Sequence, residues 1–126
     1  MVNENGHIPS YTPEAYYGRT SDSLEYVKVD KSVYYERVDE FLTLVRDMDT
    51  RKTVGFKLKG FYNMFRGLIE DSIITDAEFI LLVRVFEKVL TKRGTKLTTA
   101  LKAHYDEAYQ MAGNDNVRIS VRSLAA

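Results

Sequence analysis

The chain has 126 residues, which fits one domain, and its 18 basic residues balance its 18 acidic residues. Zero formal charge removes the simplest argument for a nucleic-acid or anionic-membrane partner, although a neutral total can hide separate charged patches. The absence of cysteine excludes disulfides, thiolate catalysis and cysteine-based zinc sites. With no visible secretory signal and no apolar run near the roughly 20 residues of a membrane-spanning helix, we expect a cytoplasmic protein.

Residues 1–23 are expected to form an extended arm, because they lack a helical period and carry both prolines of the chain. Proline fixes its own φ angle and biases the preceding residue towards extended conformations. The arm carries Tyr11, Tyr16 and Tyr17. Two interpretations stay open, a frayed terminus or an arm that docks on a partner with these three tyrosines as anchors.

Two short segments alternate between apolar and polar residues, as β-strands do. They are residues 24–29, at the start of the predicted main domain (24–116), and residues 117–122, within the predicted C-terminal strand or tail (117–126). The two segments allow an antiparallel ribbon. Because a two-stranded ribbon is marginally stable alone, it would have to pack on helices or pair with another chain.

The middle of the chain shows apolar residues at helical spacing, which predicts four helices. Their expected ranges are 30–48, 53–71, 76–93 and 96–112. The third has a capping box, Thr75 with Glu78, and a stop signal at Lys92, Arg93 and Gly94. The short connection to the fourth helix predicts that these two helices are antiparallel neighbours. The predicted fold is therefore mainly α, a small bundle of about four helices behind an extended arm.

Reactive side chains do not converge in the sequence. The two histidines, His7 and His104, are far apart, and no histidine pair or glycine-rich phosphate loop is present. Acidic residues flank the expected second turn, but they lack the regular spacing of a calcium loop. We therefore expect no catalytic residues, no metal site and no cofactor, and predict that the protein is not an enzyme.

Basic residues gather in two groups that are candidates for nucleic-acid binding. On the expected second helix, Lys52, Lys59 and Arg66 fall on one strip, with Phe56 beside it. The second group surrounds the turn between the last two helices, and its members are Lys88, Lys92, Arg93, Lys96 and Lys102. Three readings stay open: contacts to a phosphate backbone, head-to-tail self-association, or an ordinary solvated surface. A helix-turn-helix motif is disfavoured because its recognition helix, 76–93, is too apolar.

Gly60 and Gly67 lie seven residues apart in the expected second helix, where glycine is unfavourable. Either another helix or chain approaches that side closely, which makes both glycines candidate partner-binding residues, or the helix is kinked or shorter. Together these features predict a non-catalytic interaction protein, a subunit or adaptor that binds a protein partner or itself through the arm and charged helix faces. The alternative is a nucleic-acid-associated protein. Neither a membrane partner nor a small-molecule substrate is expected.

Overall fold

The computed structural model describes residues 15–70, 79–93 and 96–120. Five strands form one antiparallel sheet, in the order β1-β2-β5-β4-β3. Their bounds are β1 (Tyr16–Gly18), β2 (Ser23–Val27), β3 (Val33–Arg37), β4 (Leu42–Asp47) and β5 (Thr53–Lys59). A two-stranded sheet joins β6 (Phe79–Leu81) to β7 (Arg118–Ser120), and the helices are α1 (Phe61–Glu70), α2 (Leu82–Arg93) and α3 (Thr99–Asn114). The protein is mixed α/β, so the predicted mainly α bundle of four helices is wrong.

The first predicted helix, residues 30–48, is instead the hairpin of β3 and β4. Asp39 forms the turn, since its Oδ1 accepts hydrogen bonds from the backbone N–H groups of Phe41 (2.9 Å) and Leu42 (2.8 Å). Asp is favoured in turns for this ability to bond its own backbone. A bulge between Val45 and Arg46 interrupts the strict alternation of β4. The strands, the turn and the bulge together place apolar residues at a spacing that resembles that of a helix.

The predicted second helix, residues 53–71, divides into a strand and a helix. In β5 the alternate residues Val54, Phe56 and Leu58 are buried, which is the period of a strand. At Gly55 a Cβ atom would lie 2.1 Å from the Tyr26 carbonyl oxygen, so the neighbouring strand leaves no room for a side chain. Gly60 then adopts φ +68°, a conformation that ends the strand and that L side chains rarely adopt. Helix α1 begins at the next residue.

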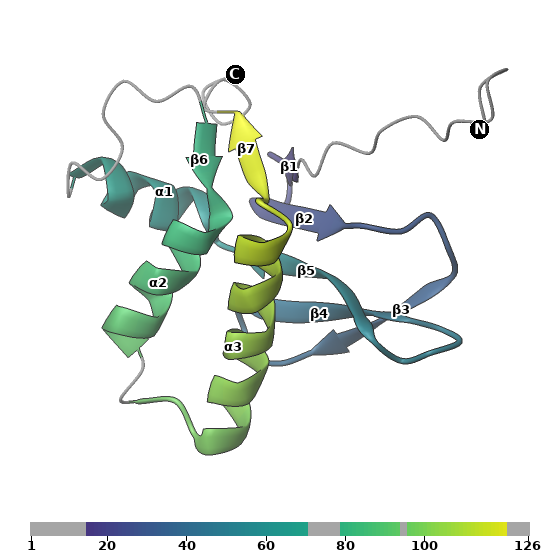
Figure 1. Cartoon of the computed structure of the whole chain (residues 1–126). Coiled ribbons are helices and arrows are strands. Elements are labelled where there is room, and N and C mark those ends of the chain that lie inside the picture. The colour runs from purple at the N-terminus through teal and green to yellow at the C-terminus, as the bar shows by residue number, and fades with distance from the viewer. Residues whose placement is uncertain (1–14, 71–78, 94–95, 121–126) are drawn as a thin grey trace, which may run out of the picture.

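The last two predicted helices are present with changed starts. Strand β6 occupies the beginning of the third, and α2 ends at Arg93 as predicted. The capping box at 75–78 lies outside the described residues. Helix α3 begins after Thr98, whose side chain accepts from the backbone N–H of Leu101. Figure 1 shows α2 and α3 side by side and antiparallel, which confirms that prediction. None of the described helices is long and apolar enough to cross a membrane.

The terminal strands exist but do not pair with each other. Strand β2 lies between β1 and β5, and β7 pairs with β6. The two sheets meet near these strands, where the backbone N–H of Ala15, just before β1, donates to the carbonyl of Arg118 in β7 (3.0 Å). The predicted arm therefore contains a strand of the main sheet, and residues 1–14 lie outside the described part.

The main core lies between one face of the large sheet and the helices (Figure 1). From the sheet come Leu24, Tyr26, Leu42, Leu44, Phe56 and Leu58, and from the helices Phe61, Phe86, Tyr105 and Ala108. Phe56 packs edge-on against Phe86 with ring centroids 5.0 Å apart, a favourable aromatic geometry. This packing leaves the opposite face of the sheet without a helix in the described part of the chain.

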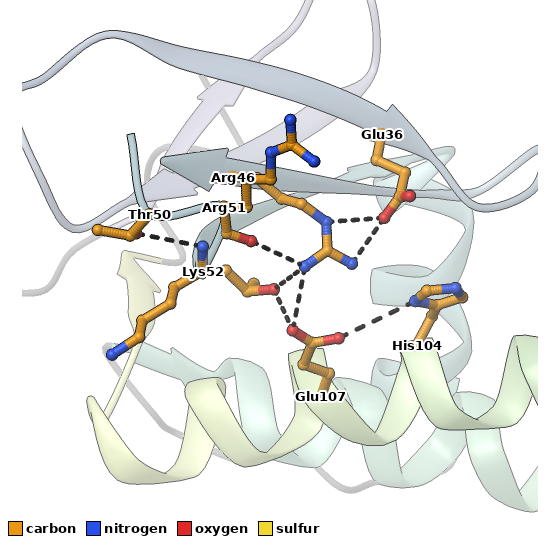
Figure 2. Close-up of polar contacts among 8 residues, drawn as sticks. Glu36, Arg46, Thr50, Arg51, Lys52, His104 and Glu107 are labelled. Carbon is orange, nitrogen blue, oxygen red and sulfur yellow. Dashed lines mark hydrogen bonds and ion pairs between the residues drawn. The ribbon is translucent and has the colours of Figure 1, made fainter. Parts of the chain in front are cut away.

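A polar cluster fastens α3 to the sheet beside this core (Figure 2). The guanidinium of Arg46 donates to Glu36 Oε1 through Nε (2.8 Å) and pairs with the same oxygen through Nη2 (2.6 Å). Its Nη1 donates to Thr53 Oγ1 (3.1 Å) and lies 3.6 Å from Glu107 Oε1 on α3. Thr53 also donates to Glu107, and His104 Nδ1 lies 3.9 Å from Glu107 Oε2. These hydrogen bonds and ion pairs connect strands β3, β4 and β5 to helix α3.

Candidate functional site

A cavity of about 210 Å³ opens between the β3–β4 turn, the end of β5, helix α1, helix α2 from Val85 onwards and the middle of α3. Its interior is mainly apolar, lined by Phe41, Leu58, Val85, Val89 and Tyr105. Its polar lining consists of Asn63, Lys88, Lys92 and Arg93. Gly60 and Gly67 complete the wall. The described lining thus joins an apolar interior to three cationic side chains and contains no carboxylate.

The two glycines make room for this cavity. Gly60 allows the chain to turn from β5 into α1, because its φ of +68° is strained for other residues. Gly67 faces α2 from within α1, and a Cβ there would meet the Nζ of Lys92 at 3.8 Å. A longer side chain at position 67 would therefore enter the space between the two helices. Neither glycine shows the expected close approach to a described residue, since both Cβ positions meet only ordinary contacts. The alternative of a shorter helix holds, because Gly60 precedes α1 and is not on the same helix as Gly67.

Arg93 is held in place at the cavity wall by contacts on both sides of its guanidinium. The guanidinium carbon lies 4.7 Å from the centre of the Phe41 ring and 5.8 Å from that of Tyr105. Nη1 donates to the Tyr105 hydroxyl (3.0 Å) and pairs with Asp39 Oδ2 (3.4 Å). Both contacts use Nη1, and no described residue accepts from Nε or Nη2, so these two groups can bind a planar anion such as a carboxylate. A group fixed in this way loses little side-chain freedom when it binds a ligand.

Asp39 sits behind Arg93 and orders this part of the cavity. Its Oδ2 accepts a 2.7 Å hydrogen bond from the Tyr105 hydroxyl. Burial alone would raise the pKa of Asp39, but hydrogen bonds from the Leu42 N–H, Tyr105 and the Phe41 N–H, with the charge of Arg93, lower it overall. Burial and the bond to Asp39 raise the pKa of Tyr105. Asp39 is therefore ionised and Tyr105 neutral over the physiological range.

The cation at the mouth of the cavity is Lys92. Its side chain is exposed, and no carboxylate in the described part of the chain pairs with it. Lys88, one turn earlier on α2, is half-buried and adds a second ammonium to the lining. The Asp39 carboxylate compensates the charge of Arg93, whereas the charge of Lys92 has no paired carboxylate among the described residues. A site with this balance attracts an anion, and its apolar wall weakens the screening by water.

The size and lining of the cavity limit what it can accept. At about 30 Å³ of liquid volume per water, about 210 Å³ corresponds to roughly seven waters. Pockets for drug-sized ligands usually span about 300–1,000 Å³, so this one suits a fragment the size of one large apolar side chain. Its chemistry therefore favours a compact apolar group next to a carboxylate or phosphate.

Five of the residues predicted from the sequence to bind a partner or a nucleic acid line this cavity. Gly60 and Gly67 came from the partner-binding set, and Lys88, Lys92 and Arg93 from the nucleic-acid-binding set. The remaining basic residues are elsewhere: Lys52 in the turn before β5, Lys59 at the end of β5, Arg66 on α1, Lys96 before α3 and Lys102 on α3. A single strip of Lys52, Lys59 and Arg66 does not exist because those positions do not share a helix.

The aromatic candidates have different positions from those expected. Phe56 is fully buried in the core, so the expectation of an exposed aromatic beside basic residues is wrong. Tyr17 packs on Phe61 and donates to Asp22 Oδ1 (2.6 Å), and burial and this bond raise the pKa of Tyr17 to about 12. Tyr16 is 74% exposed on β1. Tyr11 lies outside the described residues.

Sequence reasoning missed Phe41, Asp39 and Tyr105 as parts of one site. Asp39 and Phe41 were placed in the first predicted helix, 30–48, and Tyr105 in the fourth, 96–112. They meet because the β3–β4 turn lies against the middle of α3, a contact across 66 residues of chain. Asp39 before an apolar strand is a turn signal, and it separates the first predicted helix into two strands.

Among the described residues, no group of three or more histidine or acidic side chains is placed so that it could hold a metal ion. Comparison with known proteins adds no family to this picture. No family model, curated protein or solved structure matches the chain.

Proposed function

We propose that the protein is a non-catalytic interaction protein that captures, in its cationic cavity, a large apolar side chain of a partner together with a nearby carboxylate. The observation that supports this proposal is the placement of Lys92, Lys88 and Arg93 around an apolar interior of side-chain size. An apolar C-terminal residue of a peptide has this chemistry, because its carboxylate lies next to its own side chain. The cytoplasmic location expected from the sequence belongs to the same proposal.

The electrostatics of the cavity favour binding over catalysis. The described lining contains no carboxylate or histidine to act as a general base, and its hydroxyl, Tyr105, has a raised pKa and donates to Asp39. Arg93 is restrained by two rings and an ion pair, which suits it to orient an anion. The sequence expected partner contacts at the charged helix faces and the arm, and this proposal moves them to one site beside α2.

Isothermal titration calorimetry with N-acetylphenylalanine tests the proposal directly. This probe has about 15 non-hydrogen atoms, and about 0.3 kcal/mol per atom predicts a Kd on the order of 1 mM. N-acetylphenylalanine amide is the matched probe, because it keeps the ring and removes the charge. We expect the amide to bind at least about tenfold more weakly, which corresponds to about 1.4 kcal/mol.

Two variants and one control complete the experiment. Lys92→Glu reverses the charge at the mouth, and Gly67→Leu places a side chain in the space beside Lys92; both should abolish measurable binding. Lys102→Glu makes the same charge change on the exposed side of α3 and should bind as the original protein does. Equal binding of acid and amide, or equal loss in Lys92→Glu and Lys102→Glu, would contradict the proposal.

A further inference from the structure

The face of the five-stranded sheet that lies opposite the helices is a second surface with an unusual composition. Directly opposed residues of antiparallel strands point to the same side, so the register identifies the members of this open face. One row crosses all five strands, through Tyr16, Glu25, Lys57, Thr43 and Arg37. The next row consists of Val27, Gly55, Val45 and Tyr35. Lys59 extends the face at the end of β5.

Two tyrosine rings are exposed on this open face. Tyr16 is 74% exposed and Tyr35 is 56% exposed. They come from β1 and β3, the two outer strands of the sheet. The large aromatic residues of the opposite face, Tyr26 and Phe56, are buried against the helices. Exposed aromatic rings on a sheet are the surfaces on which unpaired bases stack.

Tyr35 lies beside a covered apolar residue of the open face. Val45, its register partner, is fully buried although it lies outside the main core cluster. The Glu25 carboxylate, which lies on the same face, raises the pKa of Tyr35 by its charge, and burial adds to the effect. Tyr35 thus combines an exposed ring with an apolar neighbour.

The charge of the open face is positive. Lys57, Lys59 and Arg37 have no carboxylate partner in the described part of the chain, and Arg37 donates only to the Asp39 carbonyl (3.2 Å). Asp47 is neutralised by Lys31 (3.7 Å). Glu25 is the one carboxylate of the row that crosses all five strands. Cations along a face with two exposed rings complement a phosphate backbone with unstacked bases.

We propose that the open face of the sheet binds single-stranded nucleic acid, with Tyr16 and Tyr35 stacking on bases and Lys57, Lys59 and Arg37 contacting phosphates. This site is separate from the cationic cavity and uses none of its residues. The interaction is independent of base sequence, since stacking and phosphate contacts carry no base code. RNA and DNA share this chemistry, and parallel measurements distinguish them.

Fluorescence anisotropy with labelled oligonucleotides of about 12 residues, one of deoxythymidine and one of uridine, tests this inference at low salt. We expect binding that weakens as salt rises, and weaker binding to a duplex of the same length. Tyr16→Ala should weaken binding about five- to a hundredfold, the usual effect of removing one stacking ring. Lys57→Glu should also weaken it and should reduce the slope of log affinity against log salt by at least about 0.7.

Matched variants show whether the oligonucleotides bind at the open face. Tyr35→Leu removes the second ring and keeps an apolar side chain beside Val45, and Tyr35→Phe keeps the ring without the hydroxyl. We expect weak binding for the first and retained binding for the second. Lys102→Glu on α3 and Lys92→Glu at the cavity should bind the oligonucleotides unchanged. No binding at low salt, or an equal loss of oligonucleotide affinity in Lys57→Glu and Lys102→Glu, overturns the inference. Because Tyr16 is highly exposed, Tyr16→Ala tests the stacking contact even if Tyr35→Leu is unstable.

Discussion

Replacing Asp39 with alanine should be among the most damaging single substitutions in this protein. The carboxylate accepts hydrogen bonds from two backbone N–H groups, at 2.9 and 2.8 Å, and from the Tyr105 hydroxyl at 2.7 Å. It also pairs with Arg93 at 3.4 Å, and its side chain is only 13% exposed. The substitution therefore removes the side-chain hydrogen bonds that stabilise the turn between β3 and β4. It also removes the acceptor of the hydroxyl of Tyr105, a fully buried residue.

The magnitude follows from these contacts. A hydrogen bond to a charged group contributes about 1.5–3 kcal/mol, and a buried polar group left without a partner costs about 1–3 kcal/mol. Water can replace Asp39 at the half-buried Phe41 N–H, and Arg93 still contacts Tyr105, so the contributions do not add fully. We expect a loss of about 3–5 kcal/mol in the free energy of unfolding, as for breaking other buried charge pairs.

Urea unfolding followed by circular dichroism measures this loss. The control is Asp49→Ala, an exposed aspartate in the next turn, which should change the free energy of unfolding by less than about 0.5 kcal/mol. Adding Tyr105→Phe to Asp39→Ala removes the unpaired hydroxyl and should recover about 1 kcal/mol. A cost below about 1 kcal/mol for Asp39→Ala would refute the assignment of Asp39 as the group that joins the hairpin to α2 and α3.

The stability of the fold should also fall in acid, because the folded-state pKa of Asp39 and that of Asp47 both lie below the ordinary carboxyl value. A carboxyl group whose pKa is lower in the folded state stabilises the protein fully above about pH 4, and this contribution is lost as the pH falls through the folded pKa. Urea unfolding midpoints, measured from neutral pH downwards, would show this loss. Arg46→Met should lower the free energy of unfolding by about 1–3 kcal/mol in urea titrations, since it leaves Glu36 and Glu107 without their shared partner. Gly60→Ala should cost about 1–2 kcal/mol by the same assay because the position has φ +68°.

The parts of the fold that were predictable are those specified by local sequence. The end of α2 at Arg93 followed from its stop signal, and the strands near residues 24 and 118 followed from alternation. Apolar spacing predicted α3, but its start was expected three residues too early, at residue 96. The error in residues 30–48 arose because β3, its turn and the bulged β4 place apolar side chains three and four residues apart. Asp39, followed by an alternating Leu42-Thr43-Leu44, was the local signal against a helix.

The cavity could be predicted only in part, since its residues come from segments distant in sequence. Lys88, Lys92 and Arg93 were marked by charge and the two glycines by their cost in a helix. Bringing these sets together requires the crossing of α1 and α2. The open sheet face was not predictable at all from a helical interpretation, because its rows exist only through strand register. Lys57 and Arg37 share that face although 20 residues separate them in the chain.

The central claim, that the cavity beside α2 holds an apolar group and its carboxylate, is tested most directly by amide chemical shifts. A ¹H–¹⁵N correlation spectrum of the labelled protein would be recorded during titration with N-acetylphenylalanine and, separately, with its amide. We expect the acid to shift the backbone signals of Gly60, Gly67, Lys88 and Arg93, which line the cavity, and the amide to shift them far less. Shifts confined to other surfaces, or identical responses to acid and amide, would contradict the account.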